Sequence, residues 1–472
     1  MDSWCRPVML LAAIAVAVSG CAHEKGIRPA VVSEVKQSPP AETARAQTPE
    51  PAGPASMISN ARTEIQTKDE SAEPEAKPAA DAESDDPPEL TLEYLSRLAV
   101  ENHPLLRRDE ARIDSAAGNA LQAGLYPNPR FDTNNPQVFN GPNTALNVGF
   151  QQDIVVKGKL RLDRAAALRA QQQSEFALVQ DRYALLAQVR NQFYQTLAAQ
   201  YRVDVLSRLL KITELSVTIG KELVTGGTAT VDQVKLLEID HNRVLADLRN
   251  AERLLVGERE QLAAIVGFPD LMNERVAGSL TVEPPSFDEE VMRQFVTSEN
   301  AMVQIAKLDI DKNRILLKRA EAEPYPNITV GPAYQYGFNK AQEQYWMTVV
   351  FPIPVSDRNQ GNIRSARANI RDSTEALGTV QLELLRKLAD LYSSHRGARE
   401  QADRYKAQII PDARDALRLV RSGYRSGITE FAVYLQAQRT VIDATKDYVD
   451  ILEKVWTSAA NISGLLQMDK FP

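Results

Sequence analysis

Cysteine is scarce in this sequence, which has only Cys5 and Cys21 among its 472 residues. Cys5 lies in a segment that we interpret as a removable signal peptide, so the mature chain would hold no pair of thiols for a disulfide. The four histidines lie far apart and the eight methionines form no cluster, which argues against a metal site. No glycine-rich phosphate loop follows a strand-like segment. We therefore expect no cofactor and no enzyme activity.

Long apolar runs are missing as well. Beyond the first 21 residues there is no run of 18 apolar residues, so any passage through a membrane would have to use β-strands. Aromatic residues make up only 6% of the chain and charged residues 25%, a composition typical of long helices with solvated faces. The net charge of −7 lies within 22–89. The remaining body is near neutral, which argues against nucleic-acid binding.

Residues 1–20 are predicted to be a lipoprotein signal peptide. Arg6 precedes an apolar run from Val8 to Val18, and Val18-Ser19-Gly20-Cys21 resembles the bacterial lipobox, in which the cysteine is acylated after cleavage. The run is too short to span a bilayer as a helix. Ala22 rather than aspartate follows Cys21, which favours export to the outer membrane. The alternatives are an ordinary signal peptide with a chance cysteine, or a short membrane anchor.

Residues 21–89 are predicted to be the lipidated N-terminus and a disordered tether. This segment contains ten prolines, many Ala, Ser and Glu residues, and almost no large apolar side chains. Such a composition buries too little surface to offset the entropy lost on ordering.

The rest of the chain contains one pattern that occurs twice. A helical segment ends at a Tyr-Pro-Asn motif, strand-like alternation follows, and then a very long helix reverses at glycines and returns. A helix of some 65 residues is expected over 158–224, about 100 Å long, which must lie in a coiled coil. Further helices are expected over 92–124, 231–266, 288–323, 359–422 and 430–466.

Three landmarks indicate a tandem duplication. Tyr126 precedes Tyr325, Gly158 precedes Gly361, and Gly227 precedes Gly427, each by about 200 residues. We therefore place the first repeat at 90–285, with a β-hairpin over 130–155, and the second at 286–472, with a hairpin over 327–353.

Each repeat supplies two strands of about ten residues, the length of a tilted membrane strand. Four strands cannot close a barrel, and an open sheet in lipid leaves unpaired backbone groups. Closure would have to come from other subunits, and three chains would give twelve strands. The alternative is a soluble β-domain covered by helices. Residues 130–139 alternate poorly.

The order and spacing of these motifs resemble the TolC family of outer-membrane efflux proteins, and most of all its lipidated CusC/CzcC-type cation-efflux branch. The motifs are Asn102-His103-Pro104-Leu105, Ala123–Pro129, Ile409-Ile410-Pro411 and Gly423–Gly427. The resemblance implies a mainly α fold with a 12-stranded trimeric membrane β-barrel and a periplasmic α-barrel of coiled coils. It also implies a homotrimer in the outer membrane, a periplasmic adaptor, and an inner-membrane pump of the resistance-nodulation-division type.

In this family the channel closes at the periplasmic tips, so the resemblance points to the two helix reversals. Its candidate gating residues here are Gly226, Gly227, Gly423, Tyr424, Arg425, Gly427 and Glu430. The alternative is that these are solvated turn residues. Val433 and Gln436 stand where several members carry an acidic ring, so we do not expect a cation gate there. Asp232 is a candidate substitute, and Pro411 is expected to bend or restart its helix.

The function expected from these features is that of an exit duct of a tripartite efflux system, with metal cations as the cargo that the resemblance favours. One alternative is a duct for type I protein secretion. The other is a periplasmic coiled-coil scaffold lipoprotein without a pore.

Overall fold

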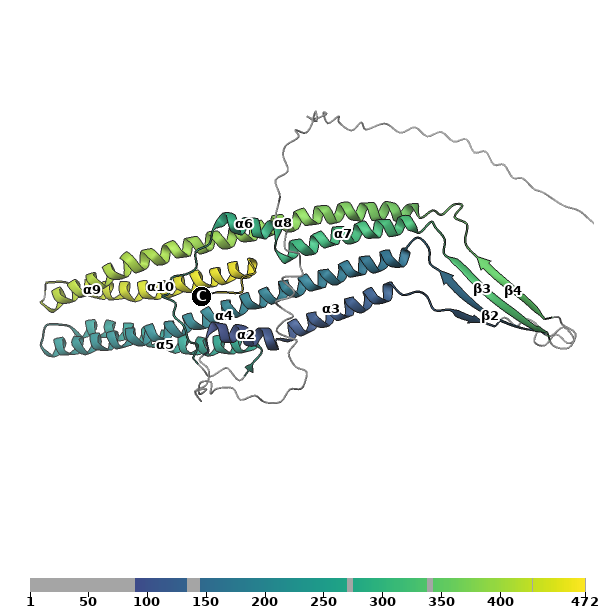
Figure 1. Ribbon diagram of the computed structural model, residues 1–472. Helices are drawn as coiled ribbons and strands as arrows, with labels where there is room; N and C mark the ends of the chain where they lie inside the picture. The colour runs from purple at the N-terminus through teal and green to yellow at the C-terminus, as the bar shows by residue number, and fades with distance from the viewer. Residues whose placement is uncertain (1–89, 134–144, 270–274, 338–342, 427, 472) are drawn as a thin grey trace, which may run out of the picture. The chain divides into compact units, whose positions relative to one another are not determined.

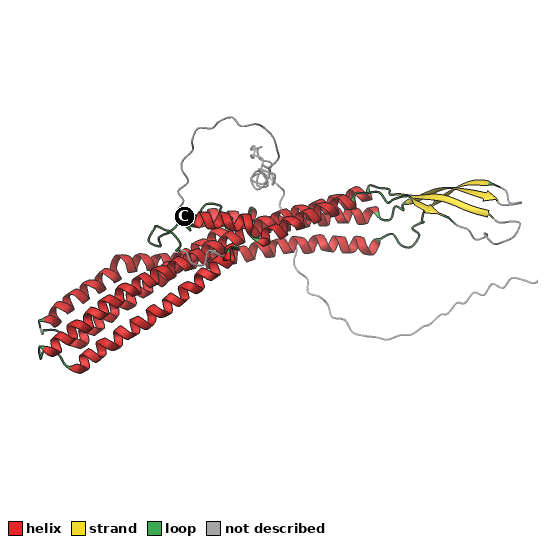
Figure 2. Cartoon of the chain, turned by 90° about the horizontal axis from the view of Figure 1, so that it is seen from below, coloured by secondary structure: helices red, strands yellow, loops and turns green. Residues whose placement is uncertain are grey.

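The computed structural model describes residues 90–133, 145–269, 275–337, 343–426 and 428–471. The chain divides into two units, residues 1–84 and 85–472, and all of the described residues belong to the second. Cys21 therefore lies outside the described residues. In the second unit, long helices lie side by side, a β-sheet lies beyond one end of them, and two helix reversals lie at the other end (Figures 1 and 2).

The two repeats contain the same elements in the same order. Those of the first are α2 (Leu92–Asn102), α3 (Pro104–Ala123), β1 (Arg130–Asp132), β2 (Ala145–Ile154), α4 (Lys159–Thr225) and α5 (Val231–Val266). Those of the second are α6 (Glu289–Ser298), α7 (Ala301–Ala322), β3 (Ile328–Gly337), β4 (Gln344–Val350), α8 (Gln360–Arg404), the π-helix η3 (Tyr405–Ile409), α9 (Ile410–Arg425) and α10 (Phe431–Leu465). The duplication inferred from the sequence thus has a structural counterpart.

Two segments expected to be single helices are each divided in two. Pro104 ends the first, because it has no N–H to continue the helix, and His103 caps α3 by accepting a hydrogen bond from the Leu105 N–H at 3.1 Å. The second divides at Asn300, whose side chain accepts a hydrogen bond from the Met302 N–H at 3.0 Å. The helical prediction over 288–323 is confirmed except for this break, which local capping explains.

The four strands form one antiparallel sheet in the order β1-β2-β3-β4. Arg130 pairs with Gln151, and Thr329 pairs with Val350, so the pairing of the first hairpin recurs at one constant offset in the second. The first strand was expected to run over 130–139, but only Arg130–Asp132 is described as strand, and residues 134–144 lie outside the described ranges.

The long helices keep this same offset up to the π-helix. Four buried residues of α4 correspond in order to four buried residues of α8: Leu185 to Leu384, Val189 to Leu388, Thr196 to His395 and Ala199 to Ala398. Gly361 is the second residue of α8 and does not correspond to Gly158, because Gly158 falls on Asp357 at the offset that the strands and long helices share. The landmark pair of Gly158 and Gly361 is therefore not a structural equivalence.

The core lies where α2, α4 and α10 meet. Trp456 of α10 is buried and stacks on Tyr194 of α4 with ring centroids 4.4 Å apart, while its indole N–H donates to the Leu280 carbonyl at 2.9 Å. A buried aromatic pair with a satisfied polar atom fixes how two helices pack. Within the described ranges, no helix is both long enough and apolar enough to traverse a bilayer.

Candidate functional site: the two helix reversals

The two helix reversals have the same backbone geometry. In the first, the N–H groups of Thr228 and Ala229 both donate to the Leu223 carbonyl, at 2.9 and 3.2 Å. In the second, the N–H groups of Ile428 and Thr429 both donate to the Gly423 carbonyl, at 2.9 and 3.1 Å. These bonds satisfy carbonyl groups that a helix end leaves unpaired. Leu223 thus corresponds to Gly423, and Ala229 corresponds to Thr429.

The glycines of these turns serve different purposes. Gly227 has a φ of +73°, the left-handed conformation expected for a helix reversal. Gly226 and Gly423 have ordinary helical geometry. A Cβ on Gly423 would lie 2.1 Å from the Thr429 hydroxyl, so this glycine is required by a close approach rather than by its φ. Gly427 lies outside the described residues.

The other candidate residues of the second turn have distinct surroundings. Tyr424 stacks on Tyr434 with centroids 5.2 Å apart and lies in an apolar cluster, so it is a packed residue rather than a solvated one. Burial raises the pKa of Tyr424 above its ordinary value, and Tyr434 adds to this. Arg425 is exposed, and Glu430 is the exposed N-cap residue of α10 without a side-chain capping bond.

Four polar contacts join the two helical hairpins near the reversals, and one of them runs from the Tyr424 hydroxyl to the Gln233 side chain at 3.4 Å. The Tyr434 and Ser216 hydroxyls lie 2.9 Å apart in a buried contact. Arg439 of α10 donates to both carboxylate oxygens of Asp240 of α5, with its shortest contact at 2.8 Å. One heptad farther along both helices, Lys446 donates to Asp247 at 2.7 Å.

The first of these ion pairs is the more enclosed. The Asp240 side chain is only 5% exposed, and Arg439 forms a bidentate contact with it. Hydrogen bonding to Asp240 is the main reason why the pKa of Arg439 is raised. A buried carboxylate that lost this partner would be poorly compensated. The pair therefore holds hairpin α4/α5 to hairpin α9/α10.

Helix α9, which leads into the second turn, is strongly basic on one face. The residues that line this face are Arg414, Leu417, Arg418, Arg421, Ser422 and Arg425. Val433 and Gln436 are exposed on α10, and Asp232 is exposed in the first turn of α5. No carboxylate stands at 433 or 436, as the sequence already shows.

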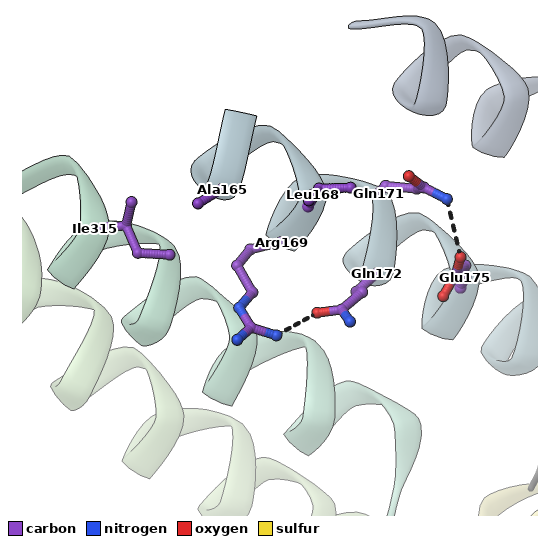
Figure 3. Close-up of a pocket in the computed structure, with 7 residues that line it drawn as sticks. All are labelled: Ala165, Leu168, Arg169, Gln171, Gln172, Glu175 and Ile315. Atoms are coloured by element: carbon purple, nitrogen blue, oxygen red, sulfur yellow. Dashed lines mark hydrogen bonds between the residues drawn. The ribbon is translucent and has the colours of Figure 1, made fainter. Parts of the chain in front are cut away.

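A pocket lies farther from the turns, between α4 and Ile315 of α7 (Figure 3). Its polar side chains pair with each other: Arg169 donates to Gln172 at 2.6 Å and Gln171 donates to Glu175 at 3.2 Å. In the described part of the chain, no group of three His, Cys, Asp or Glu side chains is placed to hold a metal ion. We assign no ligand to this pocket.

Reasoning from the sequence missed the contacts between the hairpins. Charged residues on long helices usually belong to solvated faces, so Asp240 and Arg439 gave no separate signal. A clue does exist, because opposite charges occupy nearly equivalent positions in the two repeats and recur one heptad later at Asp247 and Lys446. That recurrence is what two antiparallel hairpins packed side by side would produce.

Pro411 lies just after the π-helix, as the second residue of α9. The Ile410 N–H bonds to the Tyr405 carbonyl, five residues earlier, which is the wider spacing of a π-helix. Pro411 has no N–H and its ring crowds the preceding turn. The expectation that the helix is bent or restarted here is confirmed.

The chain resembles known outer-membrane proteins in sequence. Residues 294–466 match the family model "Outer membrane efflux protein". The cobalt-zinc-cadmium resistance protein CzcC of Cupriavidus metallidurans is 24% identical over 380 residues, which cover 80% of this chain and 90% of that protein. The outer membrane protein TolC of Vibrio cholerae is 22% identical over 375 residues, covering 74% and 84%.

The fold is also that of a solved structure. CusC, in a crystal structure that concerns folding and transmembrane channel formation, aligns with a TM-score of 0.68 at 14% identity, covering 79% of this chain and 91% of that one. These results agree with the duplicated pattern of helices, hairpin and helix reversals. Residues 294–466 thus match the outer membrane efflux protein family, and the chain resembles the CusC/CzcC-type branch of that family.

Proposed function

We propose that this protein is the outer-membrane exit duct of a tripartite efflux system. The observation that carries the proposal is the combination of the family match over 294–466 with a four-stranded sheet at one end of long paired helices. Substrates would enter from an inner-membrane pump and a periplasmic adaptor, and they would leave by passive passage. Energy and substrate choice would belong to the pump.

The duct would be assembled from three copies. β1 and β4 stand at the two edges of the described sheet. In lipid each unpaired backbone group costs several kcal/mol, so these edges need partner strands. Three copies would give a 12-stranded barrel, continued on the periplasmic side by a barrel of the long helices.

The protein would be anchored by lipid on Cys21 and would lie in the outer membrane with a large periplasmic part. Its helix reversals would meet the adaptor and would form the gate, held closed by contacts such as Asp240 with Arg439. The Cys21→Ser variant should lose palmitate labelling and should be processed differently. Labelling that survives in this variant would remove the anchor from the proposal.

Metal cations are the proposed cargo. The relative CzcC is named for resistance to cobalt, zinc and cadmium. The absence of carboxylates at Val433 and Gln436 means that selection among cations would not occur at that position. A duct for type I secretion remains the alternative, and an ABC transporter encoded beside the gene would favour it over efflux.

Two measurements test the proposal together. Deleting the gene should sensitise the cell to cobalt, zinc or cadmium within a panel of metals, dyes and antibiotics, and the gene in trans should restore resistance. The purified protein should conduct ions in planar bilayers. A protein that stays soluble and monomeric after its lipid is removed, and that never conducts, would instead be a periplasmic scaffold.

A further inference from the structure

The four-stranded sheet has one polar face and one largely apolar face. Successive residues of a strand point to opposite faces, and residues that pair across strands share a face. The polar face includes Asp132, Asn147, Gln151, Asp153, Thr329 and Gln335. The opposite face includes Phe131, Val148, Phe150, Val330, Tyr334 and Val349. All three charged residues of the described strands, Arg130 among them, therefore lie on one face.

Trp346 is the exception to this separation. It pairs with Ala333, and Ala333 pairs with Gly149 of β2, so the indole lies on the polar face. No other aromatic residue of the four described strands lies on that face. Ala333 is the sixth of the ten residues of β3, so Trp346 stands away from both ends of the sheet. Aromatic girdles form at the two membrane interfaces, so a place in a girdle does not account for this residue.

The wall beside Trp346 is kept free of larger side chains by close packing. A Cβ on Gly149 would lie 3.0 Å from the Ala333 Cβ. The Trp346 side chain is 39% exposed. On the other face, the adjacent Tyr345 packs against Tyr334 with ring centroids 4.8 Å apart. The two neighbouring aromatic residues of β4 therefore have different surroundings, and the indole is open to whatever the polar face meets.

Charge on the polar face is not balanced. Arg130 donates to the Asp153 carboxylate at 2.9 Å, and the Thr329 hydroxyl donates to the same carboxylate at 2.6 Å. The Asp132 side chain accepts a hydrogen bond from the Gln151 amide at 3.1 Å, and within the described part of the chain this neutral group is its only polar partner. The face therefore carries one carboxylate that no cation neutralises. Asp132 stands in the same row across the sheet as the indole.

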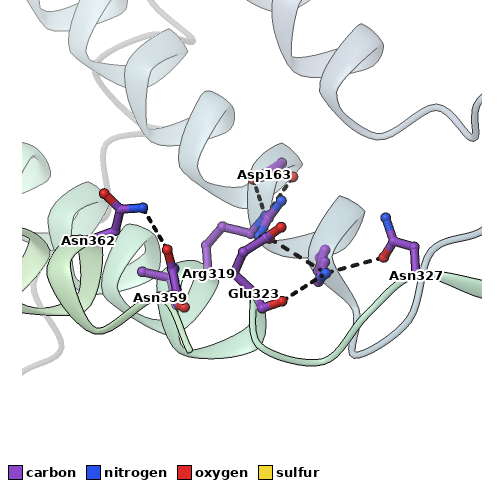
Figure 4. A network of polar contacts seen from close by, with 8 residues as sticks. Asp163, Arg319, Glu323, Asn327, Asn359 and Asn362 are labelled. Atoms are coloured by element: carbon purple, nitrogen blue, oxygen red, sulfur yellow. Dashed lines mark hydrogen bonds and ion pairs between the residues drawn. The ribbon is translucent and has the colours of Figure 1, made fainter. Parts of the chain in front are cut away.

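The charges at the base of the sheet, where the helices end, offset one another. The Lys159 ammonium donates to the Asn327 side chain at 3.2 Å and lies 3.5 Å from the Glu323 carboxylate (Figure 4). Asp163 accepts from Arg319 at 2.9 Å, as the same figure shows. Two cations and two carboxylates thus form one network. It supplies no excess positive charge to neutralise the carboxylate that is left on the sheet.

We infer that Trp346 and Asp132 form a site for organic cations on the wall of the passage. The inference rests on the proposed function, because it requires the polar face of the sheet to enclose water and the apolar face to meet lipid. Across the sheet the two residues stand three strand spacings apart, or about 14 Å. Asp132 attracts the positive charge over that distance, and the indole face of Trp346 holds the cation in contact.

The chemistry of the indole face selects the class of ligand. A cation within about 6 Å of an aromatic ring centroid is attracted by the ring, and tryptophan attracts it most strongly. The chain already contains such a contact, in which the Lys157 ammonium lies 4.1 Å from the centroid of the Tyr325 ring. Quaternary ammonium groups suit aromatic sites, whereas a small divalent ion such as Mg²⁺ gives up its water reluctantly. Such divalent ions would therefore pass this point, and organic cations would be retained.

Fluorescence tests which face Trp346 occupies. In lipid vesicles that hold the full-length protein, the emission that Trp346→Phe removes should be quenched by aqueous acrylamide and hardly at all by brominated lipids. The matched variant Tyr345→Trp/Trp346→Tyr moves the indole by one residue to the other face, and brominated lipids should quench it several-fold more. Strong quenching of the parent protein by brominated lipids would place Trp346 in lipid and overturn the inference. If brominated lipids quench neither indole, the sheet lies outside the bilayer and the proposed function fails as well.

Block of the ion current tests the ligand. Tetrabutylammonium should reduce the current through the full-length protein in planar bilayers. Trp346→Ala should raise the concentration needed for half-block several-fold, and Trp346→Phe should raise it less, because a phenyl ring keeps part of the attraction. Tyr345→Ala, at the adjacent position on the other face, is the matched control and should leave the block unchanged. Asp132→Asn should weaken the block and lower the permeability ratio of potassium to chloride.

The outcomes separate the inference from the proposed function. A protein that conducts, and whose half-block concentration is the same with and without the indole, is a duct without this site. An equal change from Tyr345→Ala would also contradict the site, since the effect would then not depend on the face. A protein that never conducts would contradict both the site and the duct.

Discussion

The first repeat spans the distance from sheet to turn with one unbroken α-helix, whereas the second uses α8, the π-helix η3 and α9 for the same distance. Leu185 corresponds to Leu384 before the π-helix, but Leu223 corresponds to Gly423 at the turns, so the offset has grown by one position. The π-helix therefore accommodates one additional residue. The comparison shows that a duplicated helix can accommodate one inserted residue as a π-helix. The buried residues on either side then keep their packing positions.

The two ion pairs that join the helical hairpins differ in how deeply they are buried. Asp240 is nearly buried, but Asp247 and Lys446 are 46% and 37% exposed. Arg439→Ala should lower the free energy of unfolding by about 3 kcal/mol, because it leaves a buried carboxylate with only the longer contact to Arg243. Lys446→Ala should cost no more than about 1 kcal/mol. Urea denaturation in detergent measures both.

Equal losses for the two variants would mean that the Asp240 carboxylate is solvated in solution. A conductance measurement adds a functional readout to the same pair. If the contact holds the two hairpins together, Arg439→Ala should increase the open fraction more than Lys446→Ala does.

The turns offer the next comparison. Gly423→Ala should destabilise the second turn by about 1 to 3 kcal/mol, because the new Cβ would overlap the Thr429 hydroxyl. Adding Thr429→Ala should recover most of this loss, since the first turn has Ala229 at the equivalent position and tolerates Leu223 in place of the glycine. Thermal unfolding of the single and double variants measures the coupling free energy between positions 423 and 429. Additive effects would contradict the close approach.

The joint between α3 and α4 differs in chemistry from that between α7 and α8. Burial and the neighbouring Asp109 raise the pKa of Asp181, whereas Val380 occupies the corresponding position in α8. A carboxyl group whose pKa is raised in the folded state stabilises the fold at pH values below its ordinary pKa near 4. This stabilisation is lost as the pH rises through the raised pKa. Asp181→Asn should therefore stabilise the protein more at pH 7 than at pH 4.

Unfolding midpoints at the two pH values check this expectation. Asp114→Asn, at an exposed position of the same helix pair, serves as the control and should shift the midpoint little at either pH. A gain from Asp181→Asn that is larger at pH 4 would reverse the assigned direction of the pKa.

Much of the fold could be predicted because prolines and glycines mark its boundaries. The long helix expected over 158–224 is observed as Lys159–Thr225, and the return helix over 231–266 as Val231–Val266. The positive φ of Gly227 followed from the need to reverse a helix. The role of Gly423 could not be foreseen, because it depends on where the Thr429 side chain lies in space.

The candidate site was harder to predict than the fold. Tyr424 looks like a solvated turn residue in the sequence, but its ring is packed against Tyr434, ten residues later. Asp240 and Arg439 resemble ordinary surface charges until the two hairpins are placed side by side. Contacts between repeats depend on their relative rotation, which the hydrophobic pattern of one helix does not determine.

The smallest expected effect concerns the π-helix itself. Its amides should exchange hydrogen several-fold faster than those of the corresponding turn of α4, because a π-turn and Pro411 weaken the local backbone bonds.

Deleting Lys406 together with Pro411→Ala should allow an unbroken α-helix and raise the protection to that of α4, with the buried residues on both sides still in place. Deleting Leu206 from α4 is the matched control, and it should instead misalign the buried residues beyond it, since α4 contains no additional residue. Hydrogen exchange by mass spectrometry distinguishes these outcomes. Equal damage from both deletions would mean that the additional residue of the second repeat is not stored in the π-helix.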